Sequence, residues 1–119
     1  MHPKTSAWAR WWLPATGEAS ATIAARVAAA RAVQDRRYAN HPGHRVNADA
    51  EGRLLEDIAT PDAEGRALLS RVADRFGLSA RGYHRILRVA RTIADLDASA
   101  TVRLPHVAEA VSYRLTSAA

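Results

Sequence analysis

The chain has 119 residues, enough for one small domain, and its lack of cysteine excludes disulfides and thiolate chemistry. Its 17 basic residues outnumber 12 acidic ones, which fits phosphate or nucleic-acid binding and equally a GC-rich genome that favours arginine. No apolar stretch approaches the roughly 20 residues that cross a bilayer, and no signal-peptide core is present, so we expect a cytoplasmic protein without a membrane partner.

Residues 1–16 differ from the rest because they contain all the tryptophans of the chain, Trp8, Trp11 and Trp12. Such a cluster can be a docking patch for a partner domain, or it can belong to a leader that precedes the folded domain. We favour the second interpretation. The prediction is a flexible leader over 1–16 and one helical domain over 17–119.

The first half of the domain is predicted to form two helices. The first covers residues 20–39, and its inward stripe consists of Ile23, Val27, Ala30 and Tyr38. Turn-forming residues predict a loop over 40–49. A short helix over 53–59 then presents three apolar side chains, Leu54, Leu55 and Ile58.

The next helix is predicted to start at Thr60-Pro61, with Thr60 as the N-cap and Pro61 in the first helical position, and to stop at Gly77. It is expected to bury four side chains, Leu68, Leu69, Val72 and Phe76. Helices over 79–96 and 105–115 follow, joined by a loop over 98–103. No alternation is long enough for a strand, so we predict an all-α fold: a small bundle of four main helices plus a short one.

The helix over 79–96 has the clearest amphipathic pattern. Ser79 is a suitable N-cap, and one face carries the apolar residues Tyr83, Ile86, Leu87, Ala90, Ile93 and Ala94. The opposite face carries a stripe of three arginines, Arg81, Arg85 and Arg88. Arg81 lies in the first turn, where the helix dipole disfavours a cation that has no anionic partner.

The same helix contains Arg91 and Asp95, which lie four residues apart. This spacing predicts a weak surface ion pair. His84 and the histidine of the last helix, His106, are predicted to be half-buried or on the surface.

Residues 78–96 read LSARGYHRILRVARTIADL, and this run resembles the signature of the C-terminal domain of magnesium-chelatase-like AAA+ ATPases, especially their competence (ComM) branch. The resemblance extends more loosely over residues 17–114. Upstream, Val27, Arg31 and Gln34 fit the first helix of that domain, and downstream Tyr113 and Arg114 fit its last helix.

The resemblance implies that the chain is the lid of a larger ATPase. In AAA+ proteins the lid contributes a sensor-2 arginine to the nucleotide phosphates, and the matching residue is Arg81. Arg85 and Arg88 would contact the ATPase core or a phosphate. The parent would use ATP and Mg²⁺, and its partners would be an AAA+ core domain, neighbouring subunits of a hexamer, and DNA whose strands it moves by branch migration in natural transformation.

The chain has no phosphate-binding Gly-x-x-x-x-Gly-Lys-Ser/Thr loop and no apolar strand that ends in an acidic magnesium ligand. We therefore expect no catalytic residue, no cofactor and no enzyme activity in the chain by itself. His41 and His44 form an H-x-x-H in a loop, but without a third close ligand they make a poor zinc site, so we predict no metal site.

Two other interpretations remain open. Residues 71–88 also read as a helix-turn-helix, with a glycine turn followed by a basic helix that could enter a DNA major groove. The chain could also be the lid of a true magnesium-chelatase subunit, which acts on a porphyrin.

Overall fold

The computed structural model describes residues 20–117, with side chains to residue 114. Within this range the chain forms five α-helices and one short 3₁₀-helix: α1 (Ser20–Arg37), η2 (Asn47–Asp49), α2 (Gly52–Ala59), α3 (Ala63–Phe76), α4 (Ala80–Leu96) and α5 (Leu104–Ser117). The predicted all-α class, with four main helices and a short one, is confirmed. The leader assigned to residues 1–16 lies outside the described residues.

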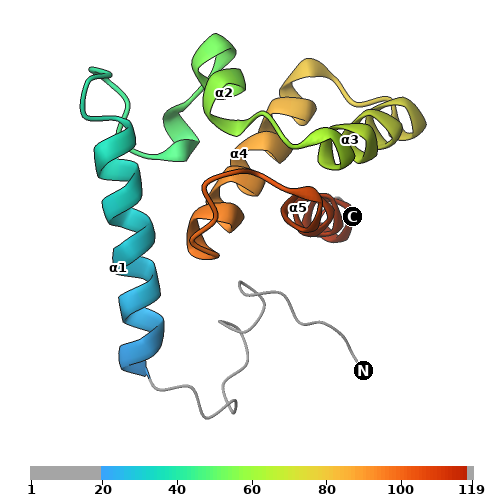
Figure 1. Ribbon diagram of the computed structural model, residues 1–119. Helices are drawn as coiled ribbons and strands as arrows, with labels where there is room; N and C mark the ends of the chain where they lie inside the picture. The colour runs from blue at the N-terminus through green and yellow to red at the C-terminus, as the bar shows by residue number, and fades with distance from the viewer. Residues whose placement is uncertain (1–19, 118–119) are drawn as a thin grey trace.

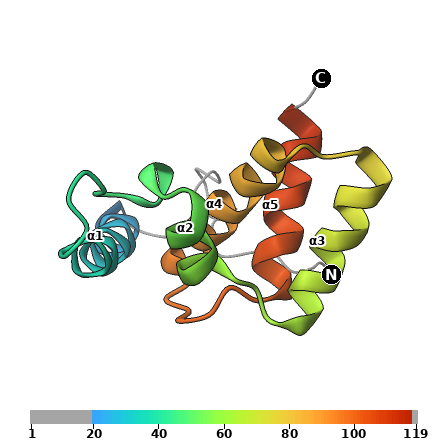
Figure 2. The ribbon, with the colours of Figure 1, turned by 90° about the horizontal axis from the view of Figure 1, so that it is seen from above.

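Helix α4 is the central element of the bundle (Figure 1). Figure 2 shows α5 lying between α4 and α3, so that α3 packs mainly on α5. On the other side, α4 contacts α2, η2 and the C-terminal part of α1. No helix of the described range is both long and apolar enough to cross a membrane.

Helix α1 joins the bundle through its C-terminal half, while its N-terminal half extends away from the other helices (Figure 1). Ala30 and Tyr38 are buried, as predicted. Ile23 and Val27 are only half-buried, so the expected inward stripe is wrong for the first two turns of the helix. The first two turns of α1 extend past α4, and no other described helix covers them.

Helix α3 starts two residues later than predicted. Asp62 is its N-cap, and the carboxylate of Asp62 accepts a hydrogen bond of 2.8 Å from the backbone N–H of Gly65. The Thr60 hydroxyl instead donates to the carbonyl of Glu56, at the end of α2. Pro61 pairs with Val102 as an isolated bridge between two extended segments. Thr60 as the cap is therefore wrong, because this pairing holds residues 60–61 extended.

The apolar face of α3 is only partly as predicted. Leu69 is fully buried and Leu68 and Val72 are half-buried, but Phe76 is 51% exposed. Helices α3 and α5 diverge toward the C-terminal end of α3 (Figure 2), so the last apolar position of the pattern is left partly exposed to solvent. Gly77 ends the helix as predicted, with a φ of 59° that glycine adopts readily.

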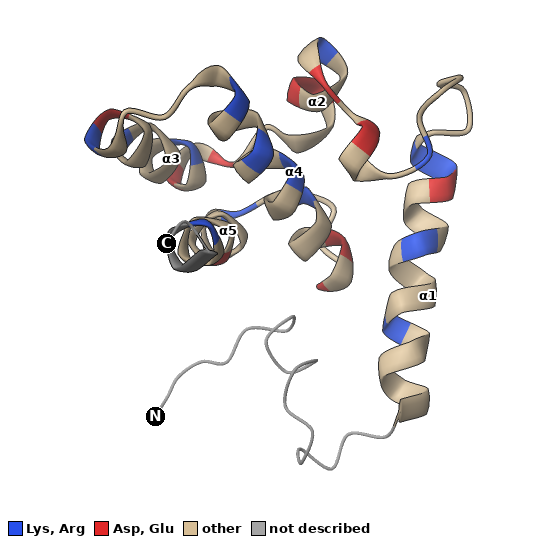
Figure 3. Cartoon of the chain, turned by 180° about the vertical axis from the view of Figure 1, so that it is seen from behind, with Lys and Arg blue, Asp and Glu red and all other residues tan. Residues whose placement is uncertain are grey.

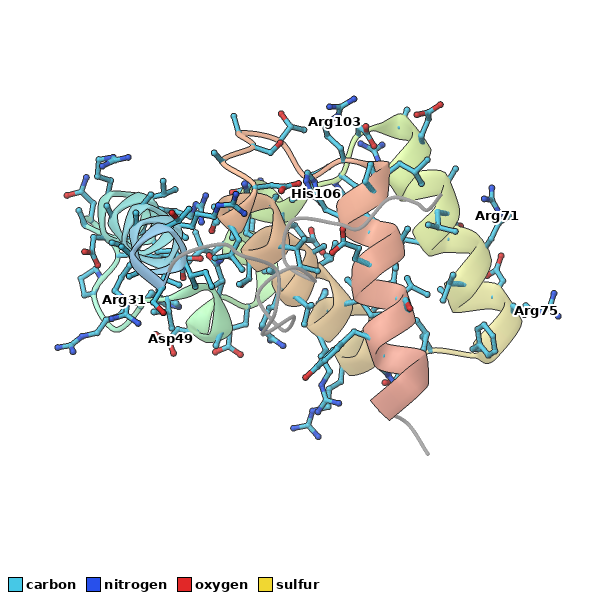
Figure 4. The ribbon with its side chains drawn as sticks, turned by 90° about the horizontal axis from the view of Figure 1, so that it is seen from below. Arg31, Asp49, Arg71, Arg75, Arg103 and His106 are labelled. Atoms are coloured by element: carbon cyan, nitrogen blue, oxygen red, sulfur yellow. The ribbon has the colours of Figure 1, made fainter. Side chains whose placement is uncertain are left out.

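His106 is 4% exposed, so its predicted position at or near the surface is wrong. Its Nδ1 accepts the backbone N–H of Arg103 at 2.9 Å, and its Nε2 lies 3.0 Å from the carboxylate of Asp97. The ring therefore caps the start of α5, the role that Glu or Gln takes in a capping box. Figure 4 shows His106 beside the first turn of this helix.

Candidate functional site

The start of α4 carries the arginines that the sequence singles out. The Ser79 hydroxyl accepts the backbone N–H of Gly82 at 3.1 Å, so the predicted N-cap is confirmed. Arg81 follows in the second helical position and is exposed. The first turn of α4 contains no acidic residue, and this end of a helix carries a partial positive charge. The guanidinium of Arg81 and the helix terminus thus present positive charge together.

Arg85 lies one turn after Arg81 and is also exposed; arginine and lysine positions along α4 are coloured blue in Figure 3. Within residues 20–117, neither arginine has an acidic side chain within ion-pair distance. Both guanidinium groups are consequently available to an anion from outside the domain. Arg can bind phosphate or carboxylate oxygens through two parallel N–H groups.

Arg88 differs from these two arginines although it belongs to the same stripe. It is half-buried, and its Nε donates to the carbonyl of Ala50 at 2.7 Å. This hydrogen bond ties the segment between η2 and α2 to the middle of α4. The stripe therefore consists of two exposed cations and one whose Nε is bound to the backbone of the domain.

The largest difference from the sequence prediction is the pair Arg91–Asp95, which is not on the surface. Both residues are buried, at 3% and 4% exposure, and Arg91 Nη2 lies 3.0 Å from Asp95 Oδ1. The surface-pair prediction is wrong because α4 is the central helix, so side chains beside the apolar stripe are covered as well. The pair is the middle of a larger polar network.

Asp95 joins three segments of the chain. Its carboxylate accepts two hydrogen bonds from Arg37 at the end of α1, at 2.8 and 2.9 Å, and one from the Asn47 side chain of η2 at 2.8 Å. The Asn47 oxygen in turn accepts the Tyr38 hydroxyl at 2.7 Å. The bonds with Asp95 raise the pKa of Arg37, and burial raises the pKa of Tyr38.

Arg91 connects α4 to the loops at the opposite end of the network. Its guanidinium donates to the backbone carbonyls of Ile58 and Ala100 at 3.1 Å and of Ser99 at 2.8 Å. Burial lowers the pKa of Arg91, and the neighbouring carboxylate of Asp95 opposes this effect. One hint was present in the sequence: Arg91 and Asp95 directly follow Ala90 and Ala94 of the apolar stripe.

The helix-turn-helix interpretation can be compared with this arrangement. A recognition helix needs a free face along its length and packs against the helix that precedes it. Here α3 packs mainly on α5 and has little contact with α4. Beyond Arg85, every residue of α4 is buried or half-buried, so no continuous exposed face runs along the helix. The geometry does not favour the insertion of α4 into a groove of DNA.

The histidines do not form a cluster in the described structure. His44 Nδ1 lies 3.3 Å from the carbonyl of Pro42, in an exposed loop. His84 is half-buried as predicted, 3.8 Å from the exposed carboxylate of Glu56. Within residues 20–117, no three His, Cys, Asp or Glu side chains are arranged to hold a metal ion.

The sequence model of the family described as "Magnesium chelatase, subunit ChlI C-terminal" matches residues 17–114, which include all of α1 to α4 and most of α5. The chain belongs to this family. Competence protein ComM of Haemophilus influenzae is 36% identical over 98 residues, and protein YifB of Escherichia coli is 39% identical over 98 residues. Each match covers 82% of this chain and 18% of the relative. The chain thus spans less than a fifth of the length of these relatives.

Proposed function

We propose that this chain is the lid of an AAA+ ATPase of the ComM type and that Arg81 is its sensor-2 arginine. The observation that carries the proposal is the exposed guanidinium of Arg81 at the start of α4, without an acidic partner in residues 20–117. The family match over 17–114 supports the lid assignment.

The parent protein would bind Mg-ATP, which supplies the phosphoryl group that is hydrolysed. Arg81 would place its planar cation where negative charge develops on the γ-phosphate, and this is the general role of an arginine in phosphoryl transfer. Arg85, one turn away, would be a second anion contact or would meet the ATPase core. Arg88 would contribute less to anion binding because its Nε holds the carbonyl of Ala50.

The activity of the whole protein is a further step of the proposal. The relationship to Competence protein ComM favours a cytoplasmic, hexameric motor that moves DNA strands by branch migration. The porphyrin chelatase alternative keeps some support from the name of the family. Branch-migration and magnesium-insertion assays on the complete parent protein distinguish the two.

The role of Arg81 can be tested in a chimera. Residues 17–114 of this chain would replace the matching 98 residues of Haemophilus influenzae ComM, and ATP hydrolysis would be measured. We expect the unmutated chimera to hydrolyse ATP and Arg81→Ala to slow it at least about tenfold, since loss of an arginine finger typically costs about 10³ or more. Arg85→Ala should be milder, and Arg75→Ala, on the outer face of α3 (Figure 4), should have no effect.

The same substitution separates a functional from a structural role. In this chain alone, Arg81→Ala should be neutral or stabilise the fold by a few tenths of a kcal/mol, because it removes a cation from a helix N-terminus. Thermal unfolding measures this change. Two results would contradict the proposal: unfolding of the variant, or unchanged hydrolysis in the chimera. A chimera that is inactive without any substitution would contradict the lid assignment itself.

A further inference from the structure

An open groove of about 480 Å³ runs along one side of α4, where the lining residues of the helix after Arg85 are half-buried or, like Ile93, buried. Its floor is formed by Val89, Thr92, Ile93 and Leu96, and its walls by Ala48 of η2 and Tyr113 of α5. Almost all of this lining is apolar. Tyr113 is 49% exposed, so a large aromatic side chain stands at the rim of an apolar groove that no described element covers.

The two ends of this α4 groove differ in charge. Arg85 and Arg88 line the end nearest the start of α4, and Leu96 lies at the other end. At a rise of about 1.5 Å per residue, Arg85 and Leu96 are about 16 Å apart, which equals three helical turns. Asp49 is adjacent to Ala48, but its carboxylate accepts the backbone N–H of Arg45 at 2.9 Å. No acidic residue is among those that line the groove.

We propose that the α4 groove binds an amphipathic helix of a partner protein, about three turns long and antiparallel to α4. An apolar stripe of the helix would pack on Val89, Ile93 and Leu96. Carboxylates near its C-terminus would meet Arg85 and Arg88, since cations stabilise the C-terminal end of a helix as well as the carboxylates.

The charge distribution and the length of the α4 groove favour an amphipathic helix over a nucleic acid. A phosphate backbone needs cations along its whole path, whereas the arginines lie at one end and the remaining floor offers few hydrogen-bond donors. Helix-in-groove recognition instead uses apolar anchors at i, i+4 and i+7, which fit a three-turn groove. The binding needs no nucleotide, so it can fail or succeed independently of the role proposed for Arg81.

The probe is a fluorescein-labelled peptide of about 11 residues, which form three helical turns, with leucines at i, i+4 and i+7 and two glutamates in its last turn. A second peptide carries lysines in place of the glutamates. Fluorescence anisotropy with the complete chain should show saturable binding of the glutamate peptide and about tenfold weaker binding of the lysine peptide, since about 1.4 kcal/mol corresponds to tenfold.

Two variants and one control locate the binding site. Tyr113→Ser and Arg85→Glu should each weaken the glutamate peptide about tenfold, and Arg85→Glu should then prefer the lysine peptide. Phe76→Ser is the matched control, because Phe76 is similarly exposed, at 51%, but lies outside the groove. Circular dichroism verifies that each variant is folded, and Arg85→Glu changes only an exposed side chain.

Four results would overturn the proposal. The first is equal binding of both peptides, and the second is binding that neither groove variant weakens. The third is a dimer in sedimentation velocity that Tyr113→Ser dissociates, which would make a second copy the occupant. The fourth is a tenfold gain in peptide affinity after removal of residues 1–19, which would make that segment the occupant.

Discussion

Asp95→Asn should destabilise the domain severely, although a surface pair at this spacing would contribute little. The Asp95 side chain is 1% exposed, and its carboxylate faces Arg37 and Arg91, whose side chains are 15% and 4% exposed. An asparagine has nearly the same shape but no charge. It would leave two guanidinium groups inside the domain without a counter-ion.

The loss in free energy of unfolding expected for Asp95→Asn follows from the burial of its ion pairs. Removal of one partner of a buried ion pair typically costs about 3–5 kcal/mol, whereas an exposed pair contributes about 0–1 kcal/mol. The larger figure applies because the Arg91 guanidinium is held by three backbone carbonyls and cannot swing out to water. A small domain is stable by only about 5–15 kcal/mol, so the variant should lose a large part of its stability.

Urea unfolding followed by circular dichroism measures this loss. The thermal midpoint should also fall by roughly 12 °C or more, at about 4–8 °C per kcal/mol. Asp57→Asn, at an exposed position of α2, is the matched control and should change stability by less than about 0.5 kcal/mol. The double variant Asp95→Asn/Arg91→Met should cost less than the sum of its parts, by about 1–3 kcal/mol. A loss below about 1 kcal/mol for Asp95→Asn would refute the argument.

Three further predictions concern stability, each measured by urea or thermal unfolding. Gly65→Ala should lower the free energy of unfolding by about 1–3 kcal/mol, because the new Cβ would lie 2.9 Å from the Asp62 carboxylate. Gly82→Ala should instead raise it by about 0.5–1 kcal/mol, because its Cβ would lie 3.6 Å from the nearest atom. A change of the same sign in both variants would contradict this prediction. Asp62→Ala should lower the free energy of unfolding by about 1 kcal/mol, because α3 loses its N-cap. Unchanged stability would show that Asp62 does not cap the helix. Burial raises the pKa of Tyr38 above its ordinary 10.0, so stability should be complete below pH 10 and fall as the pH rises through the higher folded value. Tyr38→Phe, which loses the bond to Asn47, should show a flatter alkaline curve, and parallel curves would contradict the assignment.

Most helix boundaries could be predicted because they depend on residues close in sequence. Ser79 caps α4 and Gly77 ends α3 through local backbone hydrogen bonds, which sequence patterns report directly. The apolar stripe of α4 was also predictable, since its spacing matches one helix face. These features need no knowledge of what packs against the helix.

The errors share a physical cause, which is contact between segments far apart in the chain. Thr60 has a suitable side chain for a cap, but Val102 pairs with the next residue and moves the helix start to Asp62. Phe76 fits the stripe of α3, but α3 diverges from α5 toward its C-terminal end (Figure 2), so Phe76 remains 51% exposed. Burial of Arg91 and of Asp95 depends on Arg37, 58 residues away from Asp95 along the chain. A pattern within one helix carries no information on such partners.

The residues of α4 fall into a buried group that stabilises the fold and an exposed group at the start of the helix. Seven of its residues are buried, and two of these, Arg91 and Asp95, are charged. A buried charged pair needs partners of fixed geometry on several elements, so it constrains the sequence more strongly than apolar packing does. Much of the sequence over residues 78–96 is therefore constrained by the packing of the fold. Arg81 and Arg85 are exposed and contribute nothing to the core, which leaves them available for the contacts that we propose with an outside partner. Substitution of Arg91 should thus destabilise the domain severely, whereas substitution of Arg81 should leave the domain folded and slow ATP hydrolysis in the chimera.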